Sequence, residues 1–560
     1  MAQQQERRIL RIDLASGQAV VQPLSDIAGP AWRGGRGLGV ELLARSQRFN
    51  AEEAPLVIAP GSLCGAGITM ADRAVLTGIS PLTGGIFSCS SGGEFALALQ
   101  GAGLAALLLE GKAAGPVMLQ LDADGGVTLV RADHLWGASL QQTFVGYVAA
   151  HALAAIGPAG ENGCLYADLA TRNGEPFSRG GFGALLGQRK LKGIAVAVRQ
   201  QRQEAVDQDA FAVAQQDLQR LLLASPFLFG PFGIHRHGTV NLVDLLARRG
   251  MLPGRNFGQC EEAAAACNAA AVHQRYESVA SGCGDCTVRC KRAALDGAVL
   301  PGYDELAAFT GVCGITDPGL AVALCRRCRA LGLDPVSAAG TLATWAEIGG
   351  HALTPDQLPG LLDDIAFGRG QGKVLMQGAW RLAGQQGRPE AAMTVKGLEL
   401  PPYDPRAACG LALSYAVAPH GGTHLAAWTI AAEILRKPVP VDPTCFDGKA
   451  RIVSLAEEAA AALDSLGLCR FISCAAELEE CAAVVAALSG IPCCAADLLA
   501  LGRQILQSER MINAACGITP GDDDLPQRFF STGNGLLPPL DRAAFLAELE
   551  RYRRIRQDQP

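Results

Sequence analysis

The sequence has no long basic stretch, and its formal net charge is -6 over 560 residues. Proteins that bind nucleic acid usually gather Lys and Arg on one face or along one segment, because they must neutralise phosphates. The scatter of charge along this chain therefore argues against a nucleic-acid partner. It leaves open the local binding of small anionic phosphate groups.

Long uninterrupted apolar runs are also missing. The two longest tracts, 96–109 and 481–501, are broken by Gln100 and by Pro492 with Asp497. A membrane-spanning helix needs about 20 mostly apolar residues, so we expect no membrane span. The polar start of the chain has no signal-peptide pattern. Its 19 cysteines are spread over a long chain, unlike those of a small secreted scaffold, so we expect a reducing, cytoplasmic compartment.

Length and composition predict several domains, because 560 residues exceed what one hydrophobic core organises. Residues 1–205 are rich in glycine and in short apolar runs bounded by turns, which is typical of strands. From residue 206 on, Ala, Leu, Arg and Glu recur at helical spacing, and the proline-rich run 400–405 is a rigid connector. We therefore predict an α+β fold with a β-rich N-terminal domain (1–205) and two mainly helical domains (206–405 and 406–560).

Three cysteines, Cys283, Cys286 and Cys290, form the pattern C-x-x-C-x-x-x-C. Three thiolates at this spacing can face one small inorganic group, and soft sulfur donors favour iron–sulfur clusters or zinc over hard cations. A closed site needs a fourth ligand, for which Cys469 is the candidate. The alternative is structural zinc, but zinc motifs usually come as two spaced pairs or with nearby histidines, and no histidine closely follows this triad. The pattern favours an iron–sulfur cluster.

A second C-x-x-C, formed by Cys325 and Cys328, has no third member nearby and lies on a predicted helix flanked by arginines. We interpret this pair as helix packing. The same helix should end at Gly332, after which Asp334 can cap the next helix.

The helix predicted over 450–463 ends in a similar way. It runs into Asp464, and Gly467 is expected to make a left-handed turn before Leu468 and Cys469. Both helix ends therefore place a carboxylate beside a loop suited to hold a ligand.

Glycine clusters recur in the N-terminal part, at 34–39, 90–93 and 179–184. Glycines let backbone N–H groups approach a phosphate closely, and the adjacent arginines add charge-assisted hydrogen bonds. The first cluster also resembles a dinucleotide-binding fingerprint. However, the run before it, 24–32, contains Pro30 and is a poor buried strand, which disfavours a Rossmann site.

These motifs, taken in order, resemble the aldehyde ferredoxin oxidoreductase family almost from end to end. The members of that family hold tungsten or molybdenum between two pterins (a bis-pterin cofactor) and carry one [4Fe–4S] cluster. The matching segments are 34–39, 80–84, 91–93, 157–162, 179–184, 190–196, 237–239, 255–257, the cysteine triad, 396–406, 464–469 and 523–526.

The resemblance implies a set of cofactor-binding residues. Cys283, Cys286, Cys290 and Cys469 would hold the cluster, while Asp464 with Leu468, and Asp334 with Ala338, would face the two pterins. The pterin phosphates and their bridging Mg²⁺ would lie at Arg73, Ser90 and Ala184 and at the neighbouring glycine-rich residues Gly92, Gly93, Arg179 and Gly180. Because Asp464 and Cys469 share one turn, pterin and cluster would lie close enough for electron transfer.

The resemblance also implies an activity, the oxidation of a small aldehyde with water to a carboxylic acid. Electrons would leave through the cluster to ferredoxin or to a ferredoxin-like iron–sulfur subunit. His424 matches the active-site histidine of the family and could shuttle a proton near neutral pH. Asp304 stands at the second Glu of the family's Glu-Tyr-Glu, and Glu305 is a plausible substitute for it. The family often forms homodimers.

Four positions depart from the family pattern. Ser90 stands where Asn is common, His420 where Arg is common, Thr423 where Cys is common, and Gly302 where the first Glu would be. These changes leave two alternatives to a free-standing aldehyde oxidase. One is a non-catalytic or partner-dependent electron-transfer subunit, and the other is a subunit of an aromatic-thioester reductase.

Overall fold

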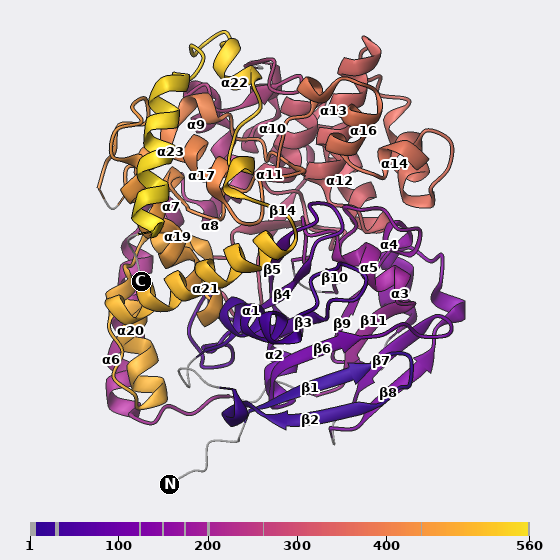
Figure 1. The fold of residues 1–560 in the computed structure, drawn as a ribbon, viewed down its shortest axis with the longest axis vertical. Helices are drawn as coiled ribbons and strands as arrows, with labels where there is room; N and C mark the ends of the chain where they lie inside the picture. The colour runs from indigo at the N-terminus through magenta and orange to yellow at the C-terminus, as the bar shows by residue number, and fades with distance from the viewer. Residues whose placement is uncertain are drawn as a thin grey trace.

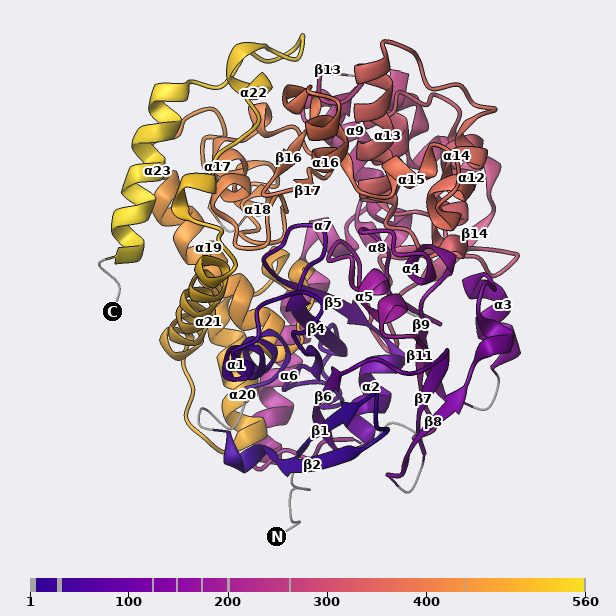
Figure 2. The ribbon, with the colours of Figure 1, turned by 45° about the vertical axis from the view of Figure 1, so that its right-hand side comes forward.

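The structure is a computed structural model that describes residues 7–27, 33–122, 125–147, 150–172, 175–198, 202–260, 263–437 and 439–557. Two β-sheets lie at one end of the molecule, and helices from the rest of the chain cover the other end and one flank (Figures 1 and 2). This arrangement confirms the predicted α+β fold. The boundaries proposed at 205/206 and 405/406 stay predictions, although the last strand of the sheets ends at Val196 and helices dominate from Gln208 on.

The first sheet has six strands in the order β2-β1-β6-β3-β4-β5. Its members are β1 (Arg8–Asp13), β2 (Ala19–Pro23), β3 (Leu56–Pro60), β4 (Arg73–Ile79), β5 (Ile86–Gly92) and β6 (Leu104–Glu110). Strands β3 and β6 are apolar almost throughout and buried along their length, as expected for strands covered on both faces. Only the β1–β6 pair is parallel within this sheet.

The second sheet has five strands in the order β10-β9-β11-β7-β8. They are β7 (Val117–Leu121), β8 (Val127–Arg131), β9 (Ala152–Ala155), β10 (Ala170–Thr171) and β11 (Leu191–Val196). Strands β7 and β8 form an antiparallel hairpin with Gly125 at φ 83° in its turn. Glycine adopts this conformation without a steric penalty.

Three short hairpins complete the strands. They are β12 (Pro253–Gly254) with β13 (Gln259–Cys260), β14 (Ser278–Ser281) with β15 (Lys291–Ala294), and β16 (Thr394–Val395) with β17 (Leu398–Glu399). The β14–β15 hairpin matters most for function, because its loop carries the cysteine triad.

The helices before residue 310 are α1 (Gly35–Ser46), α2 (Glu94–Gly101), α3 (Leu140–Gly146), α4 (Pro158–Glu161), α5 (Phe182–Gln188), α6 (Gln208–Ala224), α7 (Pro226–Phe229), α8 (Ile234–His237), α9 (Leu242–Arg248), α10 (Ala269–Arg275) and α11 (Tyr303–Ala307). The helices that follow are α12 (Pro318–Leu331), α13 (Pro335–Gly349), α14 (Leu358–Phe367), α15 (Gly372–Leu375), α16 (Ala379–Gln385), α17 (Cys409–Val417), α18 (Ile430–Glu433), α19 (Lys449–Leu466), α20 (Leu478–Ser489), α21 (Ala495–Ala515), α22 (Arg528–Ser531) and α23 (Arg542–Gln557). Among the described residues, no helix combines the length and apolar character that crossing a membrane requires.

Helix ends behave as their sequences predict. Gly332 ends α12 in the left-handed region at φ 74°, and Gly467 does the same after α19 at φ 81°. The Asp334 carboxylate accepts hydrogen bonds from the Val336 and Ser337 amides and so caps α13. These predictions are confirmed. The second C-x-x-C pair is also as expected, because Cys325 and Cys328 on α12 are fully buried in the apolar core.

The first glycine cluster packs backbones together. A Cβ added to Gly35 would lie 2.1 Å from the Asp464 carbonyl oxygen, and one added to Gly34 would lie 2.6 Å from the Ser62 amide nitrogen. The start of α1 therefore rests directly on the end of α19. The segment that would precede a dinucleotide fingerprint, 28–32, lies outside the described residues.

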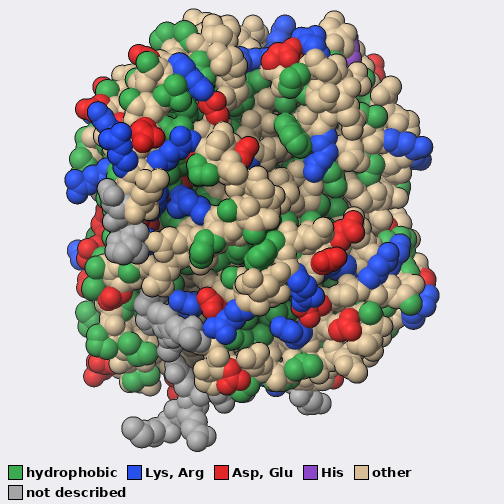
Figure 3. Space-filling model, viewed as in Figure 1, with side chains coloured by type: hydrophobic (Ala, Val, Ile, Leu, Met, Phe, Trp, Pro, Cys, Tyr) green, Lys and Arg blue, Asp and Glu red, His purple; other side chains and the backbone are tan. Residues whose placement is uncertain are grey.

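Charge is spread over the surface as well as along the sequence. On the face drawn in Figure 3, Lys and Arg side chains are interspersed with Asp and Glu side chains.

Candidate active site

A cavity of about 390 Å³ lies where the N-terminal sheet meets the helical part of the chain. Its walls come from β4 and β5, the β14–β15 loop, the start of α11, the loop at 420–428 and the turn after α19. Thirteen of the residues singled out in the sequence line it: Cys283, Cys286, Cys290, Cys469, Arg73, Ser90, Arg179, Asp334, Asp464, Leu468, His424, Asp304 and Glu305. Residues that lie almost 400 positions apart in the chain thus share one space.

Five other candidates do not line this cavity. Gly180, Ala184 and Ala338 lie outside its walls, as do Gly92 and Gly93 at the end of β5. Gly92 nevertheless borders the cysteines, because a Cβ added there would lie 3.0 Å from Cys283 Sγ. Contact of these five residues with a cofactor stays a prediction.

The cysteine triad is held by the β14–β15 hairpin. The Cys286 amide donates to the Cys283 carbonyl at 3.0 Å, which folds the loop into a turn that directs its thiols inward. The fourth thiol arrives from the turn after α19, where the Cys469 amide donates to the Met70 carbonyl at 2.9 Å. Cys469 thus lines the same cavity as the triad, and its role as the fourth ligand stays a prediction.

The cavity gives these thiols an unusual environment. Burial raises the pKa of Cys290 well above its usual range, and the Cys469 and Cys283 thiolates beside it raise it further. Burial likewise raises the pKa of Cys469, against the opposing effect of the Arg73 guanidinium. Four crowded, half-buried thiols become stable thiolates when a cationic centre binds them. Within the described ranges, no group of three or more His, Cys, Asp or Glu side chains is arranged to hold a single metal ion.

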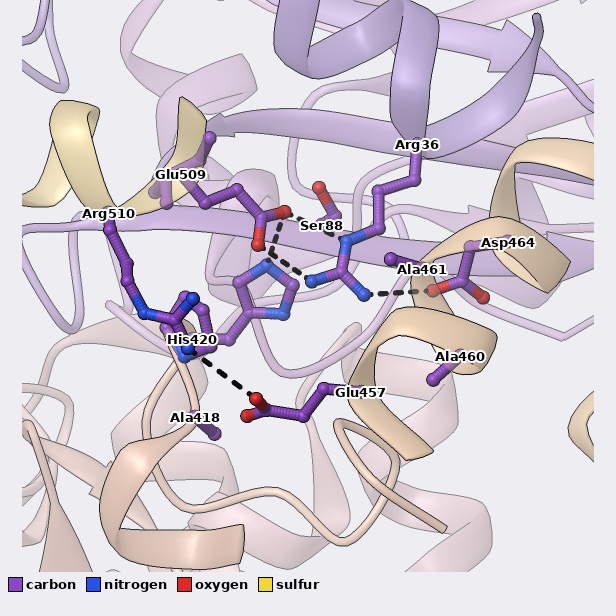
Figure 4. A network of polar contacts seen from close by, with 12 residues as sticks. Arg36, Ser88, Ala418, His420, Glu457, Ala460, Ala461, Asp464, Glu509 and Arg510 are labelled. Carbon is purple, nitrogen blue, oxygen red and sulfur yellow. Dashed lines mark hydrogen bonds and ion pairs between the residues drawn. The ribbon is translucent and has the colours of Figure 1, made fainter. Parts of the chain in front are cut away.

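Asp464 faces the cavity from the last turn of α19 and is fixed by two arginines, of which Figure 4 shows Arg36. Its Oδ2 atom accepts from Arg470 Nη2 at 2.7 Å and lies 3.3 Å from Arg36 Nη1. These bonds hold the carboxylate in one orientation, as a residue that must meet a ligand requires.

Arg36 is itself anchored by a deeply buried carboxylate. Arg36 Nε and Nη2 donate to Glu509 on α21 at 2.8 and 2.7 Å, and His420 Nε2 lies 3.2 Å from the same carboxylate (Figure 4). Although burial opposes ionisation, Arg36 and His420 hold the pKa of Glu509 far below its usual range. Burial lowers the pKa of His420 despite the nearby Glu509. Glu509 on α21 is therefore linked to Asp464 through Arg36, which pairs with both carboxylates.

Asp334 has a matching arrangement on another wall. Arg179 Nη1 lies 3.2 Å from Asp334 Oδ2 and 3.3 Å from Ser337 Oγ. Arg179 Nη2 donates to the Glu399 carbonyl. Each aspartate predicted to face a pterin is thus paired with arginine from a different part of the chain.

Arg73 lies on β4 beside the cysteines and Ser90. Its Nε and Nη2 atoms donate to Ser90 Oγ at 3.2 and 2.9 Å, and Nη2 also donates to the Ser90 carbonyl at 3.0 Å. Burial lowers the pKa of Arg73, but Cys469, Cys283 and nearby carboxylates outweigh this effect and raise it. Arg73 is a fixed cation at the cysteine end of the cavity.

His424 lies against Asp304 and Tyr403. Its Nε2 atom is 3.6 Å from Asp304 Oδ2, and its ring is 4.5 Å from the ring of Tyr403. Burial lowers the pKa of His424, although the Asp304 charge opposes the shift. Its Nδ1 atom is buried and has no hydrogen-bond partner in the part of the chain that the structure describes. A neutral imidazole with one uncommitted nitrogen can take up a proton.

Glu305 lies beside Asp304 but is engaged elsewhere. Arg329 pairs with its carboxylate, and Glu305 Oε2 accepts from the Gly302 amide at 3.0 Å. Burial raises the pKa of Glu305, and Arg329 opposes the rise. Asp304 is therefore the better placed of the two acids to act with His424. Helix α11, which carries both, continues directly into a π-helical turn at 308–312, a feature often found at functional sites.

Comparison with known proteins places this geometry in a family. Residues 9–198 match the family described as aldehyde ferredoxin oxidoreductase, N-terminal domain, and residues 214–556 match aldehyde ferredoxin oxidoreductase, domains 2 & 3. The chain belongs to the aldehyde ferredoxin oxidoreductase family. It is therefore an oxidoreductase, as the resemblance implied.

Curated members of this family match over nearly the whole chain. The tungsten-containing aldehyde ferredoxin oxidoreductase of Thermococcus kodakarensis is 31% identical, with 98% of this chain and 95% of that protein aligned. The enzyme of the same description from Pyrococcus furiosus is also 31% identical, with the same shares covered. More distantly, an aliphatic sulfonate oxidoreductase, WOR-like subunit, of Pyrococcus furiosus is 25% identical over 76% of each chain.

The fold is shared with solved structures. The active site complex BamBC of benzoyl coenzyme A reductase, in complex with 1,5-dienoyl-CoA, superimposes with a TM-score of 0.81. The match covers 98% of this chain and 94% of that chain at 19% sequence identity, so it supports the fold alone.

The side chains present fit the cofactors of an aldehyde ferredoxin oxidoreductase. Four half-buried thiols that share one cavity suit an iron–sulfur cluster, and two arginine-fixed aspartates suit the ring nitrogens of pterins. Sequence reasoning missed Tyr403, Arg36 and Glu509. Tyr403 lies inside the motif 396–406 and Arg36 inside the first glycine cluster, but no local pattern linked either of them to the site. Glu509 lies mid-helix and gave no signal.

Proposed function

We propose that this protein oxidises a small aldehyde to a carboxylic acid with water, using tungsten or molybdenum bound by two pterins and a [4Fe–4S] cluster. The observation that carries the proposal is that Cys469 and the triad Cys283, Cys286 and Cys290 line the same cavity as His424 and Asp464. The similarity to two enzymes described as tungsten-containing aldehyde ferredoxin oxidoreductases supports it.

The pterin-bound metal, when present, would supply the two-electron redox chemistry. Asp464 with Leu468 and Asp334 with Ala338 would orient the two pterins. Arg73, Ser90, Ala184 and their glycine-rich neighbours would hold the pterin phosphates and a bridging Mg²⁺. The four cysteines would hold the cluster.

The protein's own residues would manage the protons. The reaction of an aldehyde with water gives a carboxylic acid, two protons and two electrons, so a base is needed beside the reacting carbon. Neutral His424 can accept a proton at one ring nitrogen while Asp304 stabilises the resulting imidazolium. Tyr403 keeps the Asp304 carboxylate in place.

Electrons would leave toward the cysteine loop. Leu468 and Cys469 follow Asp464 on one turn, so the predicted pterin and cluster sites are only a few residues apart. Gly284, Asp285 and Arg289 of the cysteine loop are exposed, which gives an acceptor direct access to this end. We propose ferredoxin or a ferredoxin-like iron–sulfur subunit as the acceptor, in a cytoplasmic setting, and a homodimer as a possible assembly.

Metal analysis of the purified protein, coupled to aldehyde-dependent reduction of a viologen dye, tests this proposal. We expect iron together with tungsten or molybdenum, release of pterin on denaturation, and dye reduction that requires aldehyde. Zinc as the sole metal, with no pterin released, would refute it.

A second candidate function is that of a subunit in a larger complex. It is supported by the 25% identical relative, which is itself described as a subunit. In that case the protein would transfer electrons only within a larger iron–sulfur complex, including one of the aromatic-thioester reductase type. Purification of the chain alone and with bound partners separates the two. Aldehyde-dependent dye reduction by the lone chain supports the enzyme, and activity found only with partners supports the subunit.

A further inference from the structure

Aromatic side chains gather at one end of the cavity. Aromatic residues make up only 5% of this chain, yet Tyr403, Trp428 and Phe471 all line the cavity around His424. The ring centroids of Tyr403 and His424 are 4.5 Å apart, those of His424 and Trp428 are 5.6 Å apart, and those of Trp428 and Phe471 are 5.9 Å apart. A scarce residue type is therefore concentrated next to the proposed proton acceptor.

The contacts among these rings are of the kind that also hold an aromatic guest. Trp428 and Phe471 meet edge to face at an interplanar angle of 78°, while Tyr403 and His424 are tilted by 38°. Aromatic pairs prefer offset or edge-to-face arrangements with centroids about 4.5–7 Å apart. A flat guest placed among these rings would meet both ring faces and ring edges.

The rest of the cavity wall is mixed. Its apolar part is contributed by Val240, Leu242, Val272, Leu300, Val336, Leu425 and Ala426, and its charged part includes Asp304, Arg179 and Arg470. Apolar walls favour a substrate that buries apolar surface. They disfavour a substrate with polar groups, because these groups lose their hydrogen bonds to water.

One cation of the cavity wall, Arg470, is already engaged by the protein. Arg470 Nε donates to the Leu425 carbonyl at 3.1 Å, its Nη1 donates to the Ala460 carbonyl at 2.5 Å, and its Nη2 donates to Asp464 at 2.7 Å. All three nitrogens of Arg470 have partners in the protein. The guanidinium is therefore committed to these partners and is not available to pair with a charged substituent of a substrate. The walls therefore suit an uncharged ring.

We propose that Trp428, Phe471 and Tyr403 form an aryl-binding subsite, so that the preferred substrates are uncharged aromatic aldehydes and not short aliphatic ones. This inference rests on the proposed function, because the aldehyde carbon must lie near His424 while its ring lies among the aromatic side chains. Benzaldehyde is the simplest substrate with this shape, and acetaldehyde lacks the ring.

Steady-state kinetics of the metal-loaded protein test the subsite with these two aldehydes. We expect kcat/KM for benzaldehyde to exceed that for acetaldehyde by at least about tenfold, because the buried ring adds apolar area and aromatic contacts. The variants Trp428→Leu and Phe471→Leu should raise the KM for benzaldehyde by about tenfold each while changing kcat/KM for acetaldehyde less than about twofold. Equal preference for the two aldehydes in the unmodified protein would overturn the inference, as would equal losses for both in the variants.

The matched control is Trp380→Leu. Trp380 lies on α16, is 55% exposed and lies outside the cavity walls, so its removal should leave the preference unchanged. A control that shifts the preference as much as Trp428→Leu does would also count against the subsite.

Binding of the acid products gives a readout that needs no turnover. By calorimetry, the metal-loaded protein should bind benzoate more tightly than acetate, and Trp428→Leu should weaken benzoate binding alone. If no aldehyde is oxidised, the proposed function fails, yet tighter binding of benzoate would still support an aryl subsite. If aldehydes are oxidised but benzoate and acetate bind alike, the subsite fails and the proposed function stands.

Discussion

The hydroxyl of Tyr403 donates a hydrogen bond to Asp304 Oδ1 at 2.6 Å, and the other oxygen of the same carboxylate faces His424. Burial raises the pKa of Tyr403 well above its usual range, and the Asp304 charge raises it further, so the phenol stays protonated and remains a donor. Tyr403 is itself held from behind, because the Tyr415 hydroxyl donates to its carbonyl at 3.3 Å. The result is a Tyr–Asp–His arrangement inside the cavity in which Tyr403 positions the acid.

The first prediction concerns this hydroxyl. Tyr403→Phe removes a hydrogen bond to a charged group, so the Asp304 carboxylate should lose its fixed orientation toward His424. We expect kcat to fall about 10- to 100-fold with a smaller change in KM. Steady-state kinetics with an aldehyde and a viologen dye measure this.

The control for this variant is Tyr166→Phe. Tyr166 is also fully buried and donates to a backbone carbonyl, that of Leu375, but it lies outside the cavity walls. The control should cost stability without the loss of kcat. A Tyr403→Phe enzyme with kcat unchanged would show that the hydroxyl has only a structural role.

The second prediction concerns pH. The negative charge of Asp304 raises the pKa of His424, while burial lowers it more strongly. Asp304→Asn removes the raising effect, so the pKa of His424 should fall further. The acid limb of the pH–rate profile, where protonation of His424 stops it from accepting a proton, should move to lower pH. At the same time kcat should fall by about tenfold or more, since the imidazolium loses its counter-charge.

The measurement for this prediction is kcat/KM as a function of pH, together with NMR titration of His424 labelled in the ring. An acid limb that moves to higher pH in Asp304→Asn would contradict the assignment of His424 as the proton acceptor.

Local patterns predicted much of this molecule. Spacing alone pointed to the cysteine triad, and the turn chemistry of Gly332 and Gly467 marked the ends of two helices. The cap formed by Asp334 followed from its place just after the helix that ends at Gly332. Each of these signals lies within a few residues of sequence, which is where propensity and capping act.

Long-range pairing could not be predicted in the same way. Arg36 meets Glu509 across more than 400 positions, and in sequence Arg36 appeared only as part of a glycine cluster. That cluster suggested a phosphate site, which stays a prediction, and the structure adds that its glycines let α1 lie against the backbone at Asp464. Tertiary packing decided the role of both residues, and a single sequence contains no local trace of such packing.

The third prediction tests the fourth cysteine. Cys469→Ser should lower the iron content per chain and abolish the electron paramagnetic resonance signal of the native reduced cluster, because a hydroxyl is a poor replacement for a thiolate. Dye reduction should be lost with it. Cys445→Ser is the control, since Cys445 is exposed and does not line the cavity. Native iron content in Cys469→Ser would remove Cys469 from the ligand set.

The fourth prediction concerns the buried charges behind Asp464. Glu509→Gln leaves Arg36 buried with only part of its compensation, which should lower the free energy of unfolding by about 3–5 kcal/mol. Because Arg36 also bonds Asp464, pterin content per chain should fall as well. Thermal unfolding and release of pterin on denaturation measure the two effects.

The matched control is Glu550→Gln, which breaks an exposed pair with Arg554 one turn along α23. A pair of this kind contributes only about 0.3–0.5 kcal/mol, so the control should unfold almost as the unmodified protein does. Equal stability losses in both variants would show that the Glu509–Arg36 pair has no special role.

The fifth prediction uses the close approach of α1 to the turn that carries Asp464. Gly35 has φ 42°, and a Cβ added there would lie 2.1 Å from the Asp464 carbonyl oxygen, so the backbone of one element must move. Gly35→Ala should therefore destabilise the protein by about 1–3 kcal/mol or more and displace Asp464 and Cys469 together. We expect a parallel loss of pterin, released on denaturation, and of iron, measured by metal analysis.

Gly384→Ala is the control. Gly384 lies within α16 with no atom near its missing Cβ, so alanine there should stabilise the helix by about 0.5–1 kcal/mol. If Gly35→Ala kept full pterin and iron while losing stability, the contact would serve folding alone and the two cofactor sites would not depend on the position of α1.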